Sequence, residues 1–466
     1  MIAIPSIRDK GLLRTGDVGP ASSCKNTSSV RGFNLSLSIM MKAVITRTIV
    51  TGLMIGALLQ AQNPVETPAI TLDQAIQEAI SKNLDLVAQR LNVSVAETRE
   101  ITARLRPNPV LTVAGQSLNL LGATYSPNTP LGPNQLNIHT DFPMERGHKR
   151  EERIVFAKEQ KSLAELGVRE AMRQVIFGVQ TAFVDIQQAK NNLTLAQENL
   201  RSLEGVVVIN EARLRSGDLS QLELDRSRVA SLQYRASVQQ AQLQLDQAKT
   251  RLQLLIGRKL RSPGFDVVGD LRRESIADTE VDIAKRALVG RPDYLAGQQS
   301  QVRSQADLKL QLANGKVDYS VGTEFTRQSA WGVSGNSVGL YFSMPLAVFN
   351  KNQGEIARAR REIDLAGAQK NAIEASIVTE VEQAYRQYLV SRQLLTMVET
   401  DMLLKAKSVR DITEYSYRRG EASLIEFLDA QRAFNDATQT FNDARASFAR
   451  SLYLIDTVSG ATVNGN

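Results

Sequence analysis

Two pairs of carboxylates stand at matching places in the chain, and they are its strongest candidates for chemistry. Each pair follows a glycine at similar spacing: Glu223 and Asp225 follow Gly217, and Glu426 and Asp429 follow Gly420. A glycine between two helices suits the left-handed turn of a tight helical hairpin. Carboxylates repeated around a symmetry axis just beyond such a turn would form a ring that attracts cations and repels anions. Without such symmetry they are ordinary charges of a solvated helix face.

Other reactive groups are scarce. The chain has one cysteine, Cys24, and two histidines, His139 and His148, and neither histidine has a ligand-like neighbour along the sequence. This excludes disulfides and most thiolate or histidine metal centres, so no metal site and no cofactor are predicted. Nothing in the sequence resembles a nucleophile with its base or a glycine-rich phosphate loop, so we do not expect an enzyme.

The N-terminal segment carries most of the net charge. The formal charge is +7, but residues 1–61 hold seven basic and two acidic residues, which leaves 49 basic against 47 acidic residues in the rest. A nucleic-acid partner is therefore not expected. The apolar run Ile49–Leu59 follows Lys42 and Arg47 and is too short to span a membrane, which is typical of a signal peptide. We predict an upstream over-extension at 1–40 and a signal peptide at 41–61, and hence export from the cytoplasm.

The chain repeats itself at a period of about 203 residues, which indicates duplication of a whole structural half. The segment around Gly217 aligns with that around Gly420, and the predicted repeats are 62–270 and 271–466. Each half is expected to contain a short helix, a medium helix, two strands, one very long helix and a closing helix. The expected medium, long and closing helices are 84–106, 148–214 and 219–256 in the first half, and 293–314, 352–417 and 421–457 in the second.

The long helices carry apolar residues at three- and four-residue steps over many turns, which predicts coiled-coil packing. At about 1.5 Å per residue, a helix of this length spans roughly 100 Å. The medium and closing helices of each half together nearly match the long one. We therefore expect two shorter helices to lie end to end beside each long helix.

Four short segments alternate apolar and polar residues, and they begin near residues 109, 135, 317 and 337. Their length and their single apolar face match strands of a membrane barrel, although alternation alone fits a soluble sheet as well. The export signal and the absence of a long apolar helix favour the outer membrane. Four strands cannot close a barrel, so copies must pool their strands, two giving eight and three giving twelve.

With these features the chain resembles the TolC family of outer-membrane efflux channels. The motifs that carry the resemblance are Thr71–Ile76, Met344–Ile356 and Arg419–Asp429. The resemblance implies a mainly α fold with membrane β-strands, and a homotrimer that forms a 12-stranded β-barrel continued by a coiled-coil tunnel. It also implies a passive efflux duct for small molecules or metal ions in the lipid outer membrane of a Gram-negative bacterium. The expected partners are a periplasmic adaptor and an inner-membrane pump, favoured as the resistance-nodulation-division type.

The resemblance also assigns roles at the hairpins. Glu426 and Asp429 match the acidic constriction of the family, and Glu223 and Tyr417 match positions that hold the tunnel shut. The basic partner expected two residues after Gly420 is replaced by Ala422, so Arg418 or Arg419 would have to substitute. The candidates for contact with the adaptor lie at the two hairpin tips: Arg215, Ser216, Gly217, Leu219, Arg419, Gly420 and Ser423.

The alternative is a periplasmic adaptor or coiled-coil scaffold, which would also carry an export signal and long hairpins. An adaptor should have one hairpin flanked by β-rich segments, whereas this sequence predicts two hairpins with strands in the middle of each half. Fractionation distinguishes the two, because a scaffold would be recovered in the soluble periplasmic fraction.

Overall fold

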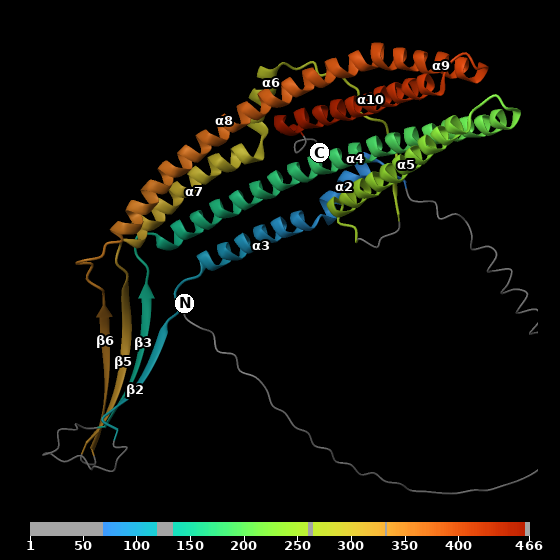
Figure 1. Ribbon diagram of the computed structural model, residues 1–466. Coiled ribbons are helices and arrows are strands. Elements are labelled where there is room, and N and C mark those ends of the chain that lie inside the picture. The colour runs from blue at the N-terminus through green and yellow to red at the C-terminus, as the bar shows by residue number, and fades with distance from the viewer. Residues whose placement is uncertain (1–68, 119–133, 260–263, 331–332, 462–466) are drawn as a thin grey trace, which may run out of the picture. The chain divides into compact units, whose positions relative to one another are not determined.

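The computed structural model describes residues 69–118, 134–259, 264–330 and 333–461 (Figure 1). The predicted over-extension, signal peptide and repeat boundary at 62 lie outside these ranges and stay predictions. Within the described residues, no helix combines the length and the apolar character that crossing a membrane requires.

The helices and the four longer strands follow the same order in the two halves, as the sequence predicted. The first half contains β1 (Ala69–Ile70), α2 (Leu72–Lys82), α3 (Leu84–Arg104), β2 (Val110–Gln116), β3 (Asn134–Met144), α4 (Lys149–Ser216), α5 (Gln221–Leu255) and β4 (Asp266–Val267). The second contains α6 (Glu280–Gly290), α7 (Pro292–Asn314), β5 (Tyr319–Ala330), β6 (Val333–Ser343), α8 (Gln353–Met397), the π-helical turn η1 (Val398–Met402), α9 (Leu403–Arg419) and α10 (Leu424–Ser459). The mainly α fold with a small set of strands is confirmed.

Local signals in the sequence explain where the helices start. Thr71 forms a capping box with Gln74, so the hydroxyl of one and the side chain of the other satisfy backbone N–H groups at the start of α2. Asn83 ends α2 and caps α3, because its side chain accepts hydrogen bonds from the backbone of Asp85 and Leu86. These caps separate the short helix from the medium one where the sequence placed the break.

α4 is the central element of the helical region. It has 68 residues, packs against α3 and α5 of its own half and also against α7 and α10 of the other half (Figure 1). α3 and α5 cover successive stretches of α4, as the length argument predicted. The largest buried cluster contains Val179, Phe183 and Ile186 of α4 together with Leu252 and Ile256 at the end of α5. Apolar burial on this scale dominates the stability of such packing.

The second long helix departs from the prediction of one uninterrupted helix over 352–417. The π-helical turn η1 interrupts it between α8 and α9. Val398 in this turn is fully buried, while Glu399 faces Arg273, whose guanidinium lies 3.0 Å from the carboxylate. Proline usually breaks a helix and none is present here, so the sequence offered no signal for the change.

The linker between the two halves ties them together. Its backbone carbonyl at Gly269 accepts a hydrogen bond from Gln187 of α4, and its Arg272 pairs with Asp456 of α10. Further along, the backbone N–H of Ile276 donates to the hydroxyl of Tyr388 in α8, at 3.1 Å. The linker therefore contacts long helices from both repeats.

The four longer strands form one antiparallel sheet in the order β2-β3-β5-β6. Directly paired residues share a face, so the register divides the sheet into two faces of different character. One face carries mainly apolar side chains: Leu111, Val113, Ile138, Phe142, Val321, Val338, Leu340 and Phe342. The other carries mainly polar ones: Thr112, Gln135, Asn137, His139, Asp141, Glu324, Thr326 and Ser337.

The strands are longer than predicted at their outer ends. The sequence suggested a loop over 327–336, but β5 continues to Ala330 and β6 begins at Val333. The polar residues of this stretch occupy paired strand positions, for example Arg327 opposite Asn336. The polar composition predicted a loop, because composition does not show that a partner strand satisfies the backbone hydrogen-bonding groups of these residues.

Replacing Gly257 by alanine is expected to destabilise the fold. Gly257 follows α5 with φ +70°, and a Cβ there would lie 2.2 Å from the carbonyl oxygen of Lys82. The left-handed backbone conformation and the collision with a fixed carbonyl oxygen should together lower the free energy of unfolding by at least about 2 kcal/mol. Gly205→Ala is the control, because its Cβ meets nothing within 4 Å inside α4 and should leave stability equal or raised by about 0.5–1 kcal/mol. Thermal unfolding of the two purified variants measures the difference, and equal midpoints would contradict the argument.

Candidate functional site

The two hairpin turns have the predicted glycine geometry. Gly217 ends α4 with φ +84°, and Gly420 ends α9 with φ +83°. In each turn the residue after the glycine donates its backbone N–H to the carbonyl oxygen five residues earlier. The N···O distance is 2.8 Å from Asp218 to Arg213 and 2.9 Å from Glu421 to Ser416. This is the Schellman arrangement that closes helices ending in a left-handed glycine. The turns are therefore built alike in both repeats.

Tyr417 is buried between the two hairpins. Its hydroxyl donates a hydrogen bond to Oδ1 of Asn210 on α4 at 2.6 Å, and its ring stacks on Phe427 of α10. The guanidinium of Arg213 lies 5.5 Å from the ring centroid, and Arg213 also donates to the backbone carbonyl of Arg418. Burial raises the pKa of the Tyr417 hydroxyl, and the hydrogen bond to Asn210 opposes that shift. Tyr417 thus joins α9 and α10 to α4 within one chain.

Glu426 is exposed and lies in the first turn of α10, where it forms a capping box with Ser423. Its carboxylate accepts hydrogen bonds from the backbone N–H of Ser423 at 2.7 Å and from the Ser423 hydroxyl at 3.0 Å. The Ser423 backbone bond, followed by the hydroxyl bond, lowers the pKa of Glu426, so the side chain is ionised at neutral pH. Ser423, predicted as a tip contact, therefore also has a structural role as the helix cap.

The other two predicted gate carboxylates, Asp429 and Glu223, lie in different surroundings. Asp429 is two-thirds exposed and 3.5 Å from Arg432 on the same helix. Glu223 is half-buried at the start of α5, where Ser220 caps its backbone N–H, and it lies near enough to Tyr417 to oppose ionisation of that hydroxyl. Within one chain, Glu223, Glu426 and Asp429 do not meet.

Neither arginine takes the place of the missing basic residue at Ala422 within one chain. Arg418 pairs with Glu414 one turn earlier, at 2.6 Å. Arg419 stacks over the ring of Tyr415, at 4.5 Å from its centroid. A lock between copies would therefore have to use other contacts or release these ones.

The predicted tip residues all lie at or beside the turns. Arg215, Ser216, Gly217, Arg419, Gly420 and Ser423 are exposed, and Leu219 is half-buried. Ser216 donates to the carboxylate of Asp218 at 2.8 Å, which holds the first turn together. The residues that sequence reasoning missed are Asn210, Arg213 and Phe427, which hold Tyr417. The sequence contains a signal for Asn210, because this polar residue follows Leu203 and Val206 at the three- and four-residue steps of the apolar seam. The structure shows that Asn210 is fully buried there.

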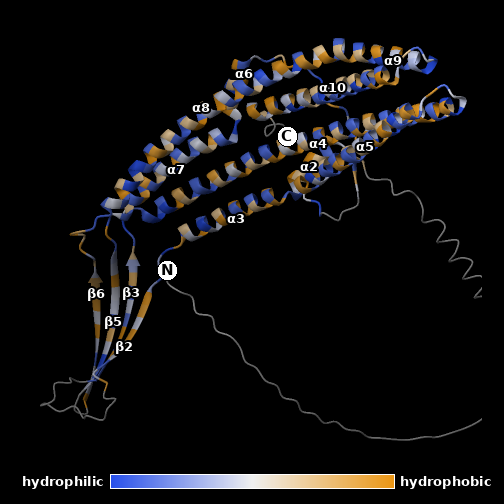
Figure 2. Cartoon of the chain, viewed as in Figure 1, coloured by the Kyte–Doolittle hydropathy of each residue, from blue (hydrophilic) through white to orange (hydrophobic). Residues whose placement is uncertain are grey.

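In the part of the chain that the structure describes, no element covers the apolar face of the sheet. Val338 is 77% exposed and Leu340 is 82% exposed, and Phe342, Leu111 and Val113 are exposed as well. Figure 2 shows hydrophobic residues interspersed with polar ones along the strands as well as along the helices. An exposed apolar surface of this extent marks a site that contacts another molecule or a membrane.

His139 has a close carboxylate partner, contrary to the sequence-based expectation. Its Nε2 lies 2.7 Å from Oδ2 of Asp141, because residues two apart on a strand share a face. His148 is exposed at the start of α4 and its side chain caps nothing. No group of three or more histidine, cysteine or acidic side chains in the described ranges is arranged to hold a metal ion.

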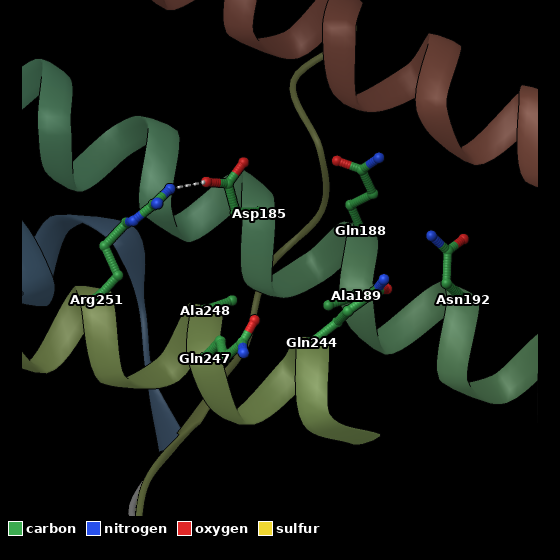
Figure 3. A pocket seen from close by; sticks show the side chains of 8 residues that line it. All are labelled: Asp185, Gln188, Ala189, Asn192, Gln244, Gln247, Ala248 and Arg251. Carbon is green, nitrogen blue, oxygen red and sulfur yellow. Dashed lines mark hydrogen bonds and ion pairs between the residues drawn. The ribbon is translucent and has the colours of Figure 1, made fainter. Parts of the chain in front are cut away.

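A pocket of about 290 Å³ lies between α4 and α5, and half of the residues that line it carry side-chain amides (Figure 3). Its one ion pair joins Arg251 of α5 to Asp185 of α4 at 3.5 Å, and Asp185 also binds Arg450 of α10 at 2.7 Å. Both arginines neutralise the carboxylate, so the pocket is a polar packing gap between helices. None of the predicted site residues lines it.

An uncovered apolar sheet face, a polar opposite face and two long helical hairpins define an outer-membrane channel subunit. Comparison with known proteins agrees. The family model described as outer membrane efflux protein matches residues 75–258 and 283–461. The chain therefore belongs to the outer membrane efflux protein family, whose members transport their cargo through the outer membrane.

Individual proteins show the same relationship. The chain is 24% identical over 368 residues to the cobalt-zinc-cadmium resistance protein CzcC of Cupriavidus metallidurans, covering 78% of this chain and 83% of that protein. It is 26% identical over 284 residues to the pyoverdine export outer membrane protein OpmQ of Pseudomonas putida, covering 57% of each. The crystal structure of the Campylobacter jejuni CmeC outer membrane channel superimposes with a TM-score of 0.68 at 17% identity, covering 84% of this chain and 85% of that one.

Proposed function

We propose that three copies of this chain form a passive outer-membrane channel through which a multi-component efflux system exports metal ions or small molecules. The sheet carries the proposal. Among the described residues, nothing covers its apolar face, and its edge strands β2 and β6 have no partner strand. Pairing β6 of one copy with β2 of the next satisfies both edges, and three copies give twelve strands.

In this arrangement the apolar face contacts lipid and the polar face lines the conducting path. The helices that follow β3 and β6 then continue the path into the periplasm as a tunnel. Gly217 and Gly420 mark the ends of the hairpins away from the sheet. The protein passes cargo without converting it, so it acts as a transporter and not as an enzyme.

The hairpin ends are the proposed gate and docking surface. Threefold symmetry makes rings of Glu426 and Asp429, whose charge favours cations in a narrow mouth. Glu223 and Tyr417 hold the mouth closed, with Tyr417 acting through its contacts with Asn210. A periplasmic adaptor meets the tip residues and links the channel to an inner-membrane pump of the resistance-nodulation-division type. These tip residues are Arg215, Ser216, Gly217, Leu219, Arg419, Gly420 and Ser423.

Divalent metal cations are the favoured cargo. The matched region of the cobalt-zinc-cadmium resistance protein covers most of both chains, whereas the match to the pyoverdine exporter covers about half of each. The carboxylate of Glu426, which accepts hydrogen bonds from Ser423, remains charged at neutral pH, and this suits a cationic cargo. No nucleic acid takes part, in keeping with the near-neutral balance of the chain beyond residue 61.

Two measurements on the purified, full-length protein test the proposal. Size-exclusion chromatography with light scattering should give the mass of three chains in detergent, and reconstitution into planar bilayers should give discrete single-channel currents. A monodisperse monomer, or repeated failure to form a pore, would contradict the channel. Fractionation into the soluble periplasm would instead favour a scaffold.

The ring of Glu426 predicts a specific change in ion selectivity. Glu426→Gln keeps a side chain that can accept the Ser423 hydrogen bonds, but it removes three charges from the mouth of a trimer. We expect the reversal potential in a salt gradient to shift toward weaker cation preference, with little change in thermal stability. Asp436→Asn is the control, because that residue lies on the same helix away from the turn. An unchanged reversal potential in Glu426→Gln would remove Glu426 from the conducting path.

A further inference from the structure

The polar face of the sheet contains a compact cluster around His139. The register places His139 opposite Glu324 of β5, and Asp141 opposite Gly322, which in turn pairs with Tyr341 of β6. All of these residues therefore share one face, across three neighbouring strands. The cluster lies in the half of β3 that leads into α4.

Contacts within the cluster hold the His139 ring in place. Nε2 of His139 lies 2.7 Å from Oδ2 of Asp141, and the His139 ring centroid lies 4.0 Å from that of Tyr341. The Tyr341 ring fits because Gly322 has no side chain, since a Cβ there would lie 2.3 Å from Cε1 of Tyr341. His139 and Asp141 are each about four-fifths shielded. The imidazole is thus packed on one side by an aromatic ring and bound on the other by a carboxylate.

The cluster has more acceptors than donors. Oδ1 of Asp141 is shielded from solvent and accepts no hydrogen bond from any described residue, and the same holds for Oδ1 of Asn137, two positions before His139. The carboxylate of Glu324 adds a further acceptor on the neighbouring strand. Shielded oxygens without a donor are uncommon, and a bound cation is one arrangement that satisfies them.

We propose that His139 and Asp141 form a weak binding site for divalent transition-metal cations such as Zn²⁺ and Co²⁺. Imidazole nitrogen and carboxylate oxygen are the donors that these ions favour. A tetrahedral ion with bonds of about 2.0–2.1 Å holds two donor atoms about 3.4 Å apart, so the observed pair needs to open by only about 0.7 Å. Water completes the coordination.

Weak binding is what the position requires. This inference rests on the proposed channel, because it takes the polar face as the wall of the conducting path. A conducting path needs sites that bind ions strongly enough to admit them and loosely enough to release them. Coordination by two protein donors of one chain, the imidazole of His139 and the carboxylate of Asp141, meets that condition.

Metal binding is tested on the full-length protein in detergent, prepared without a histidine tag. Calorimetric titration with Zn²⁺ and the visible absorption of added Co²⁺ report binding and nitrogen ligation. We expect one saturable site per chain, weakened about tenfold or more in His139→Gln and in Asp141→Asn. His148→Gln is the matched control, because the chain has only these two histidines and the His148 side chain is 83% exposed. Absence of saturable binding, or equal binding by His139→Gln and the wild type, would overturn the site.

Planar bilayers test whether the site faces the conducting path. Zn²⁺ should reduce the potassium current of the wild type and of His148→Gln, and should have no such effect on His139→Gln. The unblocked potassium current of His139→Gln serves as its folding control. Wild-type currents that ignore Zn²⁺ would refute the position of the site while leaving the channel intact. Absence of any current would refute the proposed channel, whereas the titration would still decide whether His139 and Asp141 bind the ion.

Discussion

Val338→Arg should abolish assembly in the membrane. Val338 lies in the middle of β6 on the apolar face, opposite Phe325, and is 77% exposed in the single chain. An arginine on the lipid face near the middle of the bilayer costs about 2–4 kcal/mol, and a trimer pays this three times, so the total is about 6–12 kcal/mol. We expect the variant to be lost from the outer-membrane fraction and to give no channels after reconstitution.

Ser337→Arg is the matched control for Val338→Arg. Ser337 is the preceding residue of the same strand and pairs with Thr326 on the polar face. Because successive strand residues point to opposite faces, the same side chain there should face the conducting path. This variant should assemble and conduct, with weaker cation preference. Equal membrane recovery of the two variants would show that the sheet faces are assigned wrongly.

Tyr417→Ala should open the channel at its periplasmic end. Tyr417 is buried and joins α9 and α10 to α4 through Asn210, Arg213 and Phe427. Deleting a buried aromatic side chain costs about 3–5 kcal/mol where the site does not collapse, and here that loss falls on the contact between the two hairpins. We expect a several-fold rise in single-channel conductance, because the second hairpin is no longer held to the first.

Two further variants separate the contributions of Tyr417. Tyr417→Phe keeps the ring stacked on Phe427 but leaves Asn210 without its donor, which should cost about 1–3 kcal/mol and give an intermediate conductance. Tyr415→Ala is the control, because Tyr415 lies two residues earlier, is 56% exposed and has Arg419 stacked over its ring. If Tyr417→Ala folds and conducts like the wild type, Tyr417 does not hold the gate.

Much of the fold could be predicted from the sequence because it depends on local signals. Thr71 with Gln74, the glycines 217 and 420, and the apolar steps along α4 each act over a few residues, so the helix ends fell within a few positions of the prediction. Strand alternation likewise set the two faces of the sheet. The π-helical turn had no such signal, because the buried contacts of Val398 come from distant parts of the chain.

The candidate sites were less accessible to sequence reasoning because they depend on pairs that are distant in the chain or on side-chain direction. Tyr417 meets Asn210 across more than 200 residues, and neither residue identifies the other without the packing of α10 on α9 and α4. His139 and Asp141 are neighbours in sequence, but their contact follows from their shared strand face. Roles assigned by resemblance to Glu223, Glu426 and Asp429 concern contacts between copies, which a single chain does not contain.

The π-helical turn at Val398–Met402 has a consequence for how the duplicated halves diverge. A turn closed by i→i+5 hydrogen bonds holds one residue more than an α-helical turn. An insertion at such a place is absorbed locally, and the apolar stripes before and after it keep their orientation. The two halves can therefore come to differ in length by a residue while their helices keep the same packing. A π-helical turn is thus a position at which evolution can insert a residue without rotating the buried faces of the helix.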